Sequence, residues 1–187
     1  MPTTPAAELS TIGWREWLSL PSLKIERIKA KIDTGARSSA LHAFNIETFI
    51  EDGVERVRFQ VHPHQRSGAT VITAEAKLLD RRYIRSSSGQ VQLRPVIQTP
   101  VRLGPHQWMI ELSLTNRDDM GFRLLLGRQA IRHRFLVDAG RSYLQTTKGS
   151  QPKSHNLTVS DIAPDLIQNP GDQRSTLQPD SEEVSFQ

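Results

Sequence analysis

The segment Ile32-Asp33-Thr34-Gly35 constrains the fold of this chain more than any other feature of the sequence. An aspartate stands at the end of an apolar run, and a small hydroxyl residue and a glycine follow it directly. Glycine lets the backbone turn sharply after a strand, so the pattern indicates a turn that presents the Asp33 carboxylate at a surface or an interface. An ordinary strand-ending turn, where aspartate and glycine are common residues, is the alternative interpretation.

A carboxylate in such a turn gains acid–base chemistry when a second carboxylate lies close enough to share a proton with it. One of the two is then a general base toward water, and the other is a general acid toward a substrate carbonyl. The chain holds a single Asp-Thr-Gly triplet in its 187 residues. Its weak echo, Val137-Asp138-Ala139-Gly140, favours a strand with an Asp-x-Gly turn over a second site.

The composition allows one domain with a core and excludes several kinds of site. A chain of 187 residues with 36% apolar residues predicts a single folded unit. Cysteine is absent, which excludes disulfide scaffolds, thiolate zinc sites and cysteine nucleophiles. The first residues lack a basic start and an apolar run, and no stretch is long enough to span a bilayer. We therefore expect a soluble, cytoplasmic protein without a membrane partner.

Charge and composition divide the chain into a basic body and an acidic tail. Residues 1–11 are expected to be flexible, 12–145 to form the domain, and 146–187 to be disordered, because the tail is polar and lacks apolar periodicity. The net charge of +4 becomes +8 for the body, since the tail carries −3 and Glu8 carries −1. The arginines are scattered along apparent strands, which indicates dispersed surface charge and argues against nucleic acid as a partner.

Short apolar runs alternate with turn signals along the body. Arg56 to His62 alternates strictly and predicts a strand with one apolar face, and 142–144 is expected to be the last strand. Many short strands, with 128–133 as the one candidate helix, indicate an all-β barrel or sandwich.

Two hairpins are expected in the middle of the body. Ser86-Ser87-Ser88-Gly89 predicts the tip of the first, between strands at 82–85 and 91–94. Gly104-Pro105-His106 predicts the turn of the second.

The order of these segments resembles the retropepsin-like aspartic proteases, in which an aspartate-bearing strand precedes a hairpin flap and an apolar strand that ends in Gly-Arg. Longer signatures resemble a narrower bacterial group, often labelled "ATP-dependent zinc protease", some of whose members are associated with RimK, an ATP-grasp ligase that adds glutamates to a ribosomal protein. The resemblance covers residues 12 to 145 and implies a retropepsin-like closed half-barrel with one short helix. The signatures are Gly13-Trp14-Arg15-Glu16-Trp17, Lys31-Ile32-Asp33-Thr34-Gly35-Ala36-Arg37-Ser38-Ser39-Ala40-Leu41-His42-Ala43, Leu124-Leu125-Leu126-Gly127-Arg128 and Phe135-Leu136-Val137-Asp138-Ala139-Gly140-Arg141-Ser142-Tyr143-Leu144.

The resemblance also implies a role for individual residues. The chain is about half the size of a two-domain aspartic protease, so the second carboxylate is expected from Asp33 of a second copy in a homodimer. The implied roles are catalysis for Asp33, support of the active loop for Thr34, Gly35 and Ala36, substrate binding for Arg37, Ser86, Ser87, Ser88 and Gly89, and packing behind the loop for Leu126, Gly127 and Arg128.

Arg37 is the point at which the sequence departs from the viral pattern. Viral members have an acidic residue at this position, and it pairs with the arginine that corresponds to Arg128. Arg128 must therefore find another acceptor, such as a backbone carbonyl, Asp138 or an acidic group of a partner. Arg37 is then either a ligand for an acidic substrate side chain or a solvated arginine.

The implied activity is the hydrolysis of peptide bonds in a polypeptide substrate, with an acidic tail or a cytoplasmic or ribosomal protein as the target. One alternative is a non-catalytic peptide-binding module that partners an ATP-grasp ligase. The other is a zinc-dependent hydrolase with His42, His62 and His64 as ligands. No His-Glu-x-x-His helix and no phosphate-binding Gly-Lys-Ser/Thr loop occurs, so the residues predict neither a metal nor another cofactor.

Overall fold

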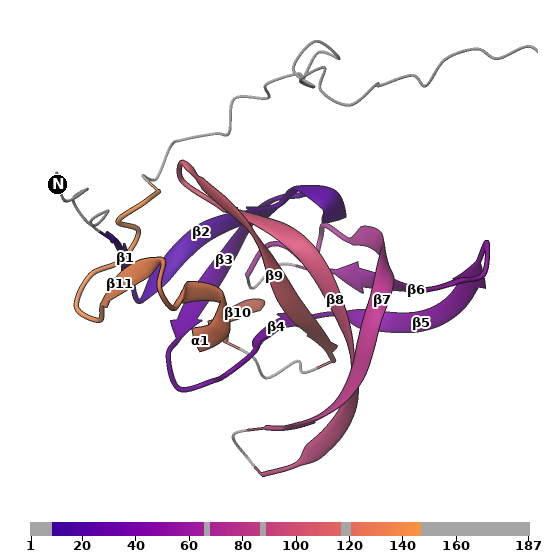
Figure 1. Ribbon diagram of the computed structural model, residues 1–187. Coiled ribbons are helices and arrows are strands. Elements are labelled where there is room, and N and C mark those ends of the chain that lie inside the picture. Colours follow the sequence, from indigo (N-terminus) through magenta and orange to yellow (C-terminus); the bar gives the residue numbers. More distant parts are fainter. Residues whose placement is uncertain (1–8, 66–67, 87–88, 117–120, 147–187) are drawn as a thin grey trace, which may run out of the picture. The chain divides into compact units, whose positions relative to one another are not determined.

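The computed structural model describes residues 9–65, 68–86, 89–116 and 121–146 (Figure 1). This part is almost entirely β-structure. The elements are β1 (Ser10–Gly13), β2 (Arg15–Leu20), the 3-10 helix η1 (Pro21–Leu23), β3 (Ile25–Asp33), β4 (Ser39–His42), β5 (Phe44–Glu51), β6 (Val54–Val61), β7 (Ile72–Arg85), β8 (Val91–Leu103), β9 (His106–Thr115), β10 (Leu124–Gly127), α1 (Arg128–Ile131) and β11 (Phe135–Asp138).

Six strands close a barrel, in the order β2-β3-β10-β4-β9-β8. The pairing of Ser19 with Arg102 joins β8 back to β2 and completes the ring. Beyond β8 the sheet continues through β7 and β6 to β5, which lie at the right of Figure 1. The predicted all-β closed barrel with one short helix is confirmed.

Alternating side chains of the strands fill the barrel. In β2, Glu16, Leu18 and Leu20 face inward and are buried. Each buried leucine or isoleucine contributes roughly 1.5–3 kcal/mol to the free energy of folding. None of the helices in the described residues is long and apolar enough to cross a membrane.

The first hairpin is longer than the sequence indicated. The predicted strands at 82–85 and 91–94 are the distal ends of β7 and β8, which have 14 and 13 residues. Pro100 does not interrupt β8, because it lies between Ile97, the last residue of β8 that pairs with β7, and Arg102, which pairs with β2.

A buried carboxylate explains two further differences from the predicted elements. Glu16 is 0% exposed, and its Oε1 accepts the backbone N–H groups of Gly13 at 2.8 Å and of Leu144 at 2.7 Å. Its Oε2 accepts the Thr146 hydroxyl at 3.1 Å. The expected strand at 142–144 is wrong, because this segment is irregular and binds a carboxylate there. β2 was not predicted from the sequence, because the charged Glu16 on its core face interrupts the apolar alternation that is typical of a strand.

The expected domain boundaries stay predictions. β1 begins at Ser10, so it includes the last two residues of the N-terminal segment that was expected to be flexible. Residues 147–187 of the expected tail lie outside the described residues.

We expect Glu16→Gln to lower the free energy of unfolding by about 2 kcal/mol, because a glutamine amide turns an NH₂ donor toward groups that are themselves donors. Urea unfolding at pH 7, followed by tryptophan fluorescence, measures the change. Glu26→Gln is the matched control, since Glu26 is exposed, and it should change stability by less than about 0.5 kcal/mol. Equal losses for both variants would contradict this role of Glu16.

Candidate active site

Asp33 is the last residue of β3, and the loop that follows it leads into β4. Between these two strands lies β10, which is parallel to β3 and antiparallel to β4. Its register sets Gly127 opposite Asp33. The strand that ends in Gly-Arg therefore packs directly behind the loop that carries the aspartate.

Backbone hydrogen bonds from the start of α1 hold this loop. The Arg128 N–H donates to the Ala36 carbonyl at 2.8 Å, and the Gln129 N–H donates to the Arg37 carbonyl at 3.0 Å. The Arg128 side chain also donates from Nη1 to the Thr34 carbonyl at 3.2 Å. Arg128 thus finds its acceptor on the backbone of its own chain, which is one of the acceptors considered from the sequence.

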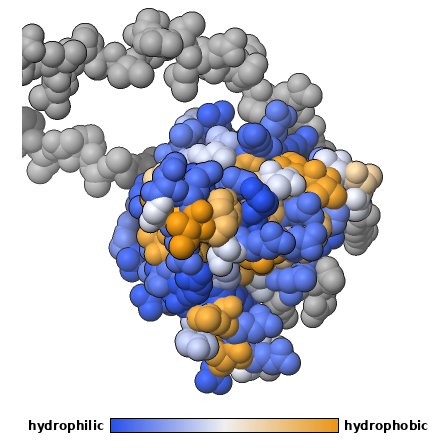
Figure 2. All heavy atoms as spheres, turned by 90° about the vertical axis from the view of Figure 1, so that its right-hand side faces the viewer, coloured by the Kyte–Doolittle hydropathy of each residue, from blue (hydrophilic) through white to orange (hydrophobic). Residues whose placement is uncertain are grey.

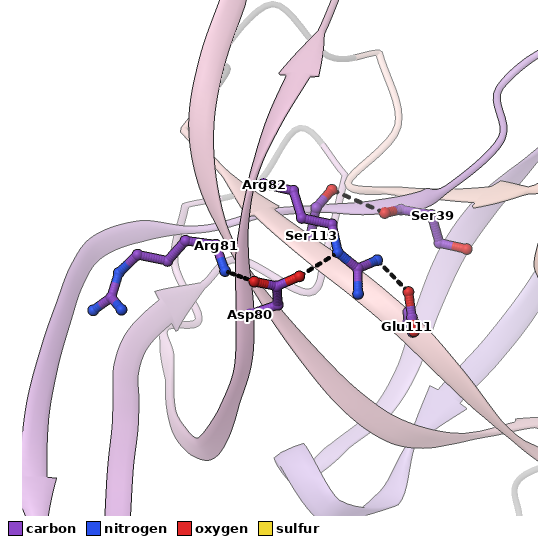
Figure 3. Close-up of polar contacts among 6 residues, drawn as sticks. All are labelled: Ser39, Asp80, Arg81, Arg82, Glu111 and Ser113. Atoms are coloured by element: carbon purple, nitrogen blue, oxygen red, sulfur yellow. Dashed lines mark hydrogen bonds and ion pairs between the residues drawn. The ribbon is translucent and has the colours of Figure 1, made fainter.

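Gly127 is required where β10 meets the loop. A Cβ atom at this position would overlap the backbone of Ser38. The Gly127 N–H donates to Ser39 Oγ at 3.1 Å, and the Ser39 carbonyl accepts the Ser113 hydroxyl at 2.9 Å (Figure 3). Together with the fully buried Leu126, these contacts join the loop to β4 and β9.

The Asp33 carboxylate is half-buried and has one capped oxygen. Its Oδ1 accepts the Ala36 N–H at 3.0 Å. Among the described residues the carboxylate takes part in no ion pair, and Oδ2 accepts no hydrogen bond. Oδ2 is therefore available to a water molecule or to a second acid.

Asp33 lies in a cleft of about 960 Å³ between its loop and the β7–β8 hairpin. The predicted site residues Asp33, Gly35, Ala36, Arg37 and Ser86 all line this cleft. The arrangement matches the expected flap, since a hairpin faces the candidate carboxylate across a cavity.

Two further predicted site residues, Thr34 and Gly89, do not line the cleft. Thr34 is exposed and contributes its carbonyl to Arg128. Gly89 adopts a φ of 83° in the hairpin turn, where glycine is favoured. Ser87 and Ser88 lie outside the described residues.

The cleft is rich in arginine. Among the described residues, two carboxylates line it, Asp33 and Glu111, and Glu111 forms an ion pair with Arg82. Four described arginines line the same cleft, so positive charge exceeds negative charge within this part of the chain; they are Arg37, Arg82, Arg85 and Arg94.

Four of these charged residues were not predicted as site residues from the sequence: Arg82, Arg85, Arg94 and Glu111. Arg82 and Arg94 could have been found by the alternation of the hairpin strands, because both face inward with Ile84 and Val96. Glu111 carried no local signal.

The hairpin also carries exposed apolar side chains. Tyr83 and Leu93 pair across the two strands and are 77% and 51% exposed, and Tyr83 also lines the cleft. Figure 2 shows apolar side chains on the projecting lower part of the molecule, where Figure 1 has the end of this hairpin. The hairpin thus combines charged side chains in the cleft with exposed apolar surface.

The histidines considered as metal ligands do not form a cluster. His42 is buried, and the ring of His62 stacks on Phe44 with 4.6 Å between the centroids. Within the described ranges, no group of three histidine, aspartate or glutamate side chains is placed to hold a metal ion.

Comparisons with known proteins agree with this architecture. A family model described as "Retropepsin-like aspartic endopeptidase RimB" matches residues 11–148. Two proteins named "Probable alpha-L-glutamate ligase", from Shewanella halifaxensis and Desulfotalea psychrophila, are 46% and 49% identical over 132 and 127 residues. These matches cover 71% and 68% of this chain but only 29% and 27% of the relatives. A crystal structure of a Legionella pneumophila protein of unknown function has a TM-score of 0.63 and 28% identity, and covers 74% of this chain and 100% of that one.

Gly127→Ala tests the close packing behind the Asp33 loop. We expect it to lower the free energy of unfolding by about 1–3 kcal/mol, because the added methyl group must displace the Ser38 backbone. Urea unfolding measures the loss. Gly121→Ala is the matched control, since its methyl group would meet no atom within 4 Å, and a loss as large as that of Gly127→Ala would contradict the packing argument.

Proposed function

The chain belongs to the RimB-like family of retropepsin-like aspartic endopeptidases, and from this we propose that it hydrolyses peptide bonds through two Asp33 carboxylates, one from each subunit of a homodimer. The observation that carries the proposal is the cleft that Asp33 lines together with the β7–β8 hairpin. A polypeptide could occupy this space with a scissile carbonyl next to the carboxylate.

The dyad would work by sharing one proton. Two carboxylates at close range do not both ionise readily, so one would be protonated and the other charged. The charged Asp33 would take a proton from the water that attacks the carbonyl, and the protonated Asp33 would donate its proton to the carbonyl oxygen. The first Asp33 would then give its proton to the leaving amine as the C–N bond breaks, while a hydroxyl group of the tetrahedral intermediate would return a proton to the second Asp33 and so restore the pair.

A second copy would supply the partner that Asp33 lacks within the described cleft. Among the described residues, Glu111 is the other carboxylate that lines the cleft, and it forms an ion pair with Arg82. Its carboxylate is thus bound to an arginine and not to Asp33. A twofold axis beside the cleft would bring in a second Asp33 with the same free Oδ2.

We propose an acidic polypeptide as the substrate and a glutamate ligase as a functional partner. The excess of arginine in the cleft favours a negatively charged chain. Arg37 is exposed in the cleft, and within the described part of the chain its side chain has no ion-pair partner. In the two relatives, the matched region is about three tenths of a protein named as a glutamate ligase. A substrate with a tail of added glutamates would agree with both the arginine-rich cleft and the similarity to proteins named as glutamate ligases.

The same relationship supports a second candidate function. A module joined to a ligase could hold an acidic tail in the cleft without cutting it. The two functions differ in whether Asp33 does chemistry, so a substitution at this residue separates them.

Asp33→Asn is expected to reduce hydrolysis of a peptide with a C-terminal glutamate tail by about a thousandfold, because the amide cannot act as acid or base. Binding of the peptide, measured by fluorescence anisotropy, should survive. Asp138→Asn is the matched control, since Asp138 stands in the similar Asp-x-Gly turn and pairs with Arg141 at 2.6 Å. Unchanged cleavage by Asp33→Asn would refute the aspartic mechanism, and binding without cleavage by the wild type would favour the non-catalytic module.

Arg37→Gln is expected to raise the KM for the glutamate-tailed peptide by about fivefold, and to leave the KM for a neutral peptide of equal length unchanged, because one charge-assisted hydrogen bond is lost. Arg132→Gln, at an exposed arginine that does not line the cleft, is the control. An equal rise in KM for both peptides would show that Arg37 does not recognise the negative charge of the substrate.

A further inference from the structure

The β7–β8 hairpin leaves the barrel at an irregularity in β7. The register pairs Leu78 with Ile97 and then Asp80 with Val96, so Leu79 is an extra residue on β7. A bulge of this kind bends the strand and increases its twist. The bulge therefore marks the point at which the hairpin turns away from the sheet.

Beyond the bulge the hairpin is a two-stranded ribbon. Pairing of β7 with β6 ends at Lys77, and pairing of β8 with β9 ends at Val96. Residues 80–85 and 91–95 consequently pair only with each other. An isolated two-stranded hairpin is marginally stable in water, so its position over the cleft depends on side-chain contacts.

Arg82 makes such a contact between the ribbon and the barrel. Its Nε donates to Asp80 Oδ2 at 2.8 Å, and its Nη1 donates to the carboxylate of Glu111 on β9 (Figure 3). Asp80 is fixed in turn by the backbone N–H of Arg81 at 2.7 Å. Because Asp80 lies on the same strand as Arg82, the Glu111 contact is the part that crosses from the ribbon to the barrel.

The charges of this group stabilise one another. The hydrogen bonds that Arg82 donates to Glu111 and Asp80 raise the pKa of Arg82, and the bond to Asp80 lowers the pKa of that carboxyl group. Arg82 and Asp80 therefore both carry their charges at neutral pH.

We propose that Arg82 is a positioning residue that ties the ribbon to the barrel through Glu111 and so sets the height of the hairpin over Asp33. The proposal rests on the proposed function in treating Asp33 as the reacting group. The tie itself is a property of the fold and can be measured without any hydrolysis.

Hydrogen exchange of the full chain, read by mass spectrometry, tests the tie. Glu111→Gln should make the amides of residues 80–86 and 89–95 exchange about three- to tenfold faster, because the ribbon loses its charged contact with β9. Arg82→Gln removes the same contact and should accelerate the same amides by a similar factor. In the double variant the second substitution should therefore add little, and this non-additivity is the signature of the tie.

Arg58→Gln is the matched control. Arg58 is an exposed arginine that forms an ion pair with Glu75 between β6 and β7, outside the ribbon. In this variant the ribbon amides should exchange within about twofold of the wild-type rate. In the peptide assay, Glu111→Gln should raise KM by the same three- to tenfold factor with a smaller change in kcat, since fewer molecules hold the hairpin in place.

Exchange in Glu111→Gln within twofold of the wild type would overturn the proposal, as would an equal acceleration by Arg58→Gln. A double variant whose acceleration equals the product of the two single accelerations would overturn it too. Accelerated ribbon exchange with the predicted non-additivity, in a protein that cleaves no peptide, would support the tie and refute the proposed hydrolysis.

Discussion

The pairing of β10 with β3 is the constraint on which the candidate site depends. It sets Gly127 against Asp33, and it leaves so little room that a single methyl group at 127 would meet the Ser38 backbone. From there α1 extends its first N–H groups to the loop carbonyls of Ala36 and Arg37. The same strand therefore both closes the barrel and fixes the Asp33 loop, because β10 is also a member of the six-stranded ring.

Rigid and adjustable parts meet in the cleft. The Asp33 loop is held by backbone contacts from three strands and a helix, and such contacts leave the carboxylate little freedom. The opposite wall is a ribbon paired only with itself beyond Asp80. A fixed acid beneath a side-chain-tethered hairpin suits a reaction in which a long polymer must enter before the cleft takes its reactive shape.

The local parts of this design could be predicted from the sequence, and the non-local parts could not. A strand that ends in Asp-Thr-Gly, and a glycine-tipped turn, are encoded within a few residues, so the loop and the hairpin tip were found. The contacts of Glu16 with Leu144 and of Arg82 with Glu111 join residues 128 and 29 positions apart. No short sequence pattern predicts such pairs. The buried Glu16 also breaks the apolar alternation by which β2 could have been predicted as a strand.

The central claim is that one active site is built from the Asp33 residues of two subunits. Mixing wild-type subunits with Asp33→Asn subunits, after exchange to equilibrium, tests this claim most directly through the rate of peptide hydrolysis. If both carboxylates are needed, an equal mixture retains about a quarter of the wild-type rate at the same total concentration, because only dimers of two wild-type subunits are active. Retention of about half the rate, the result for independent subunits, would contradict the account.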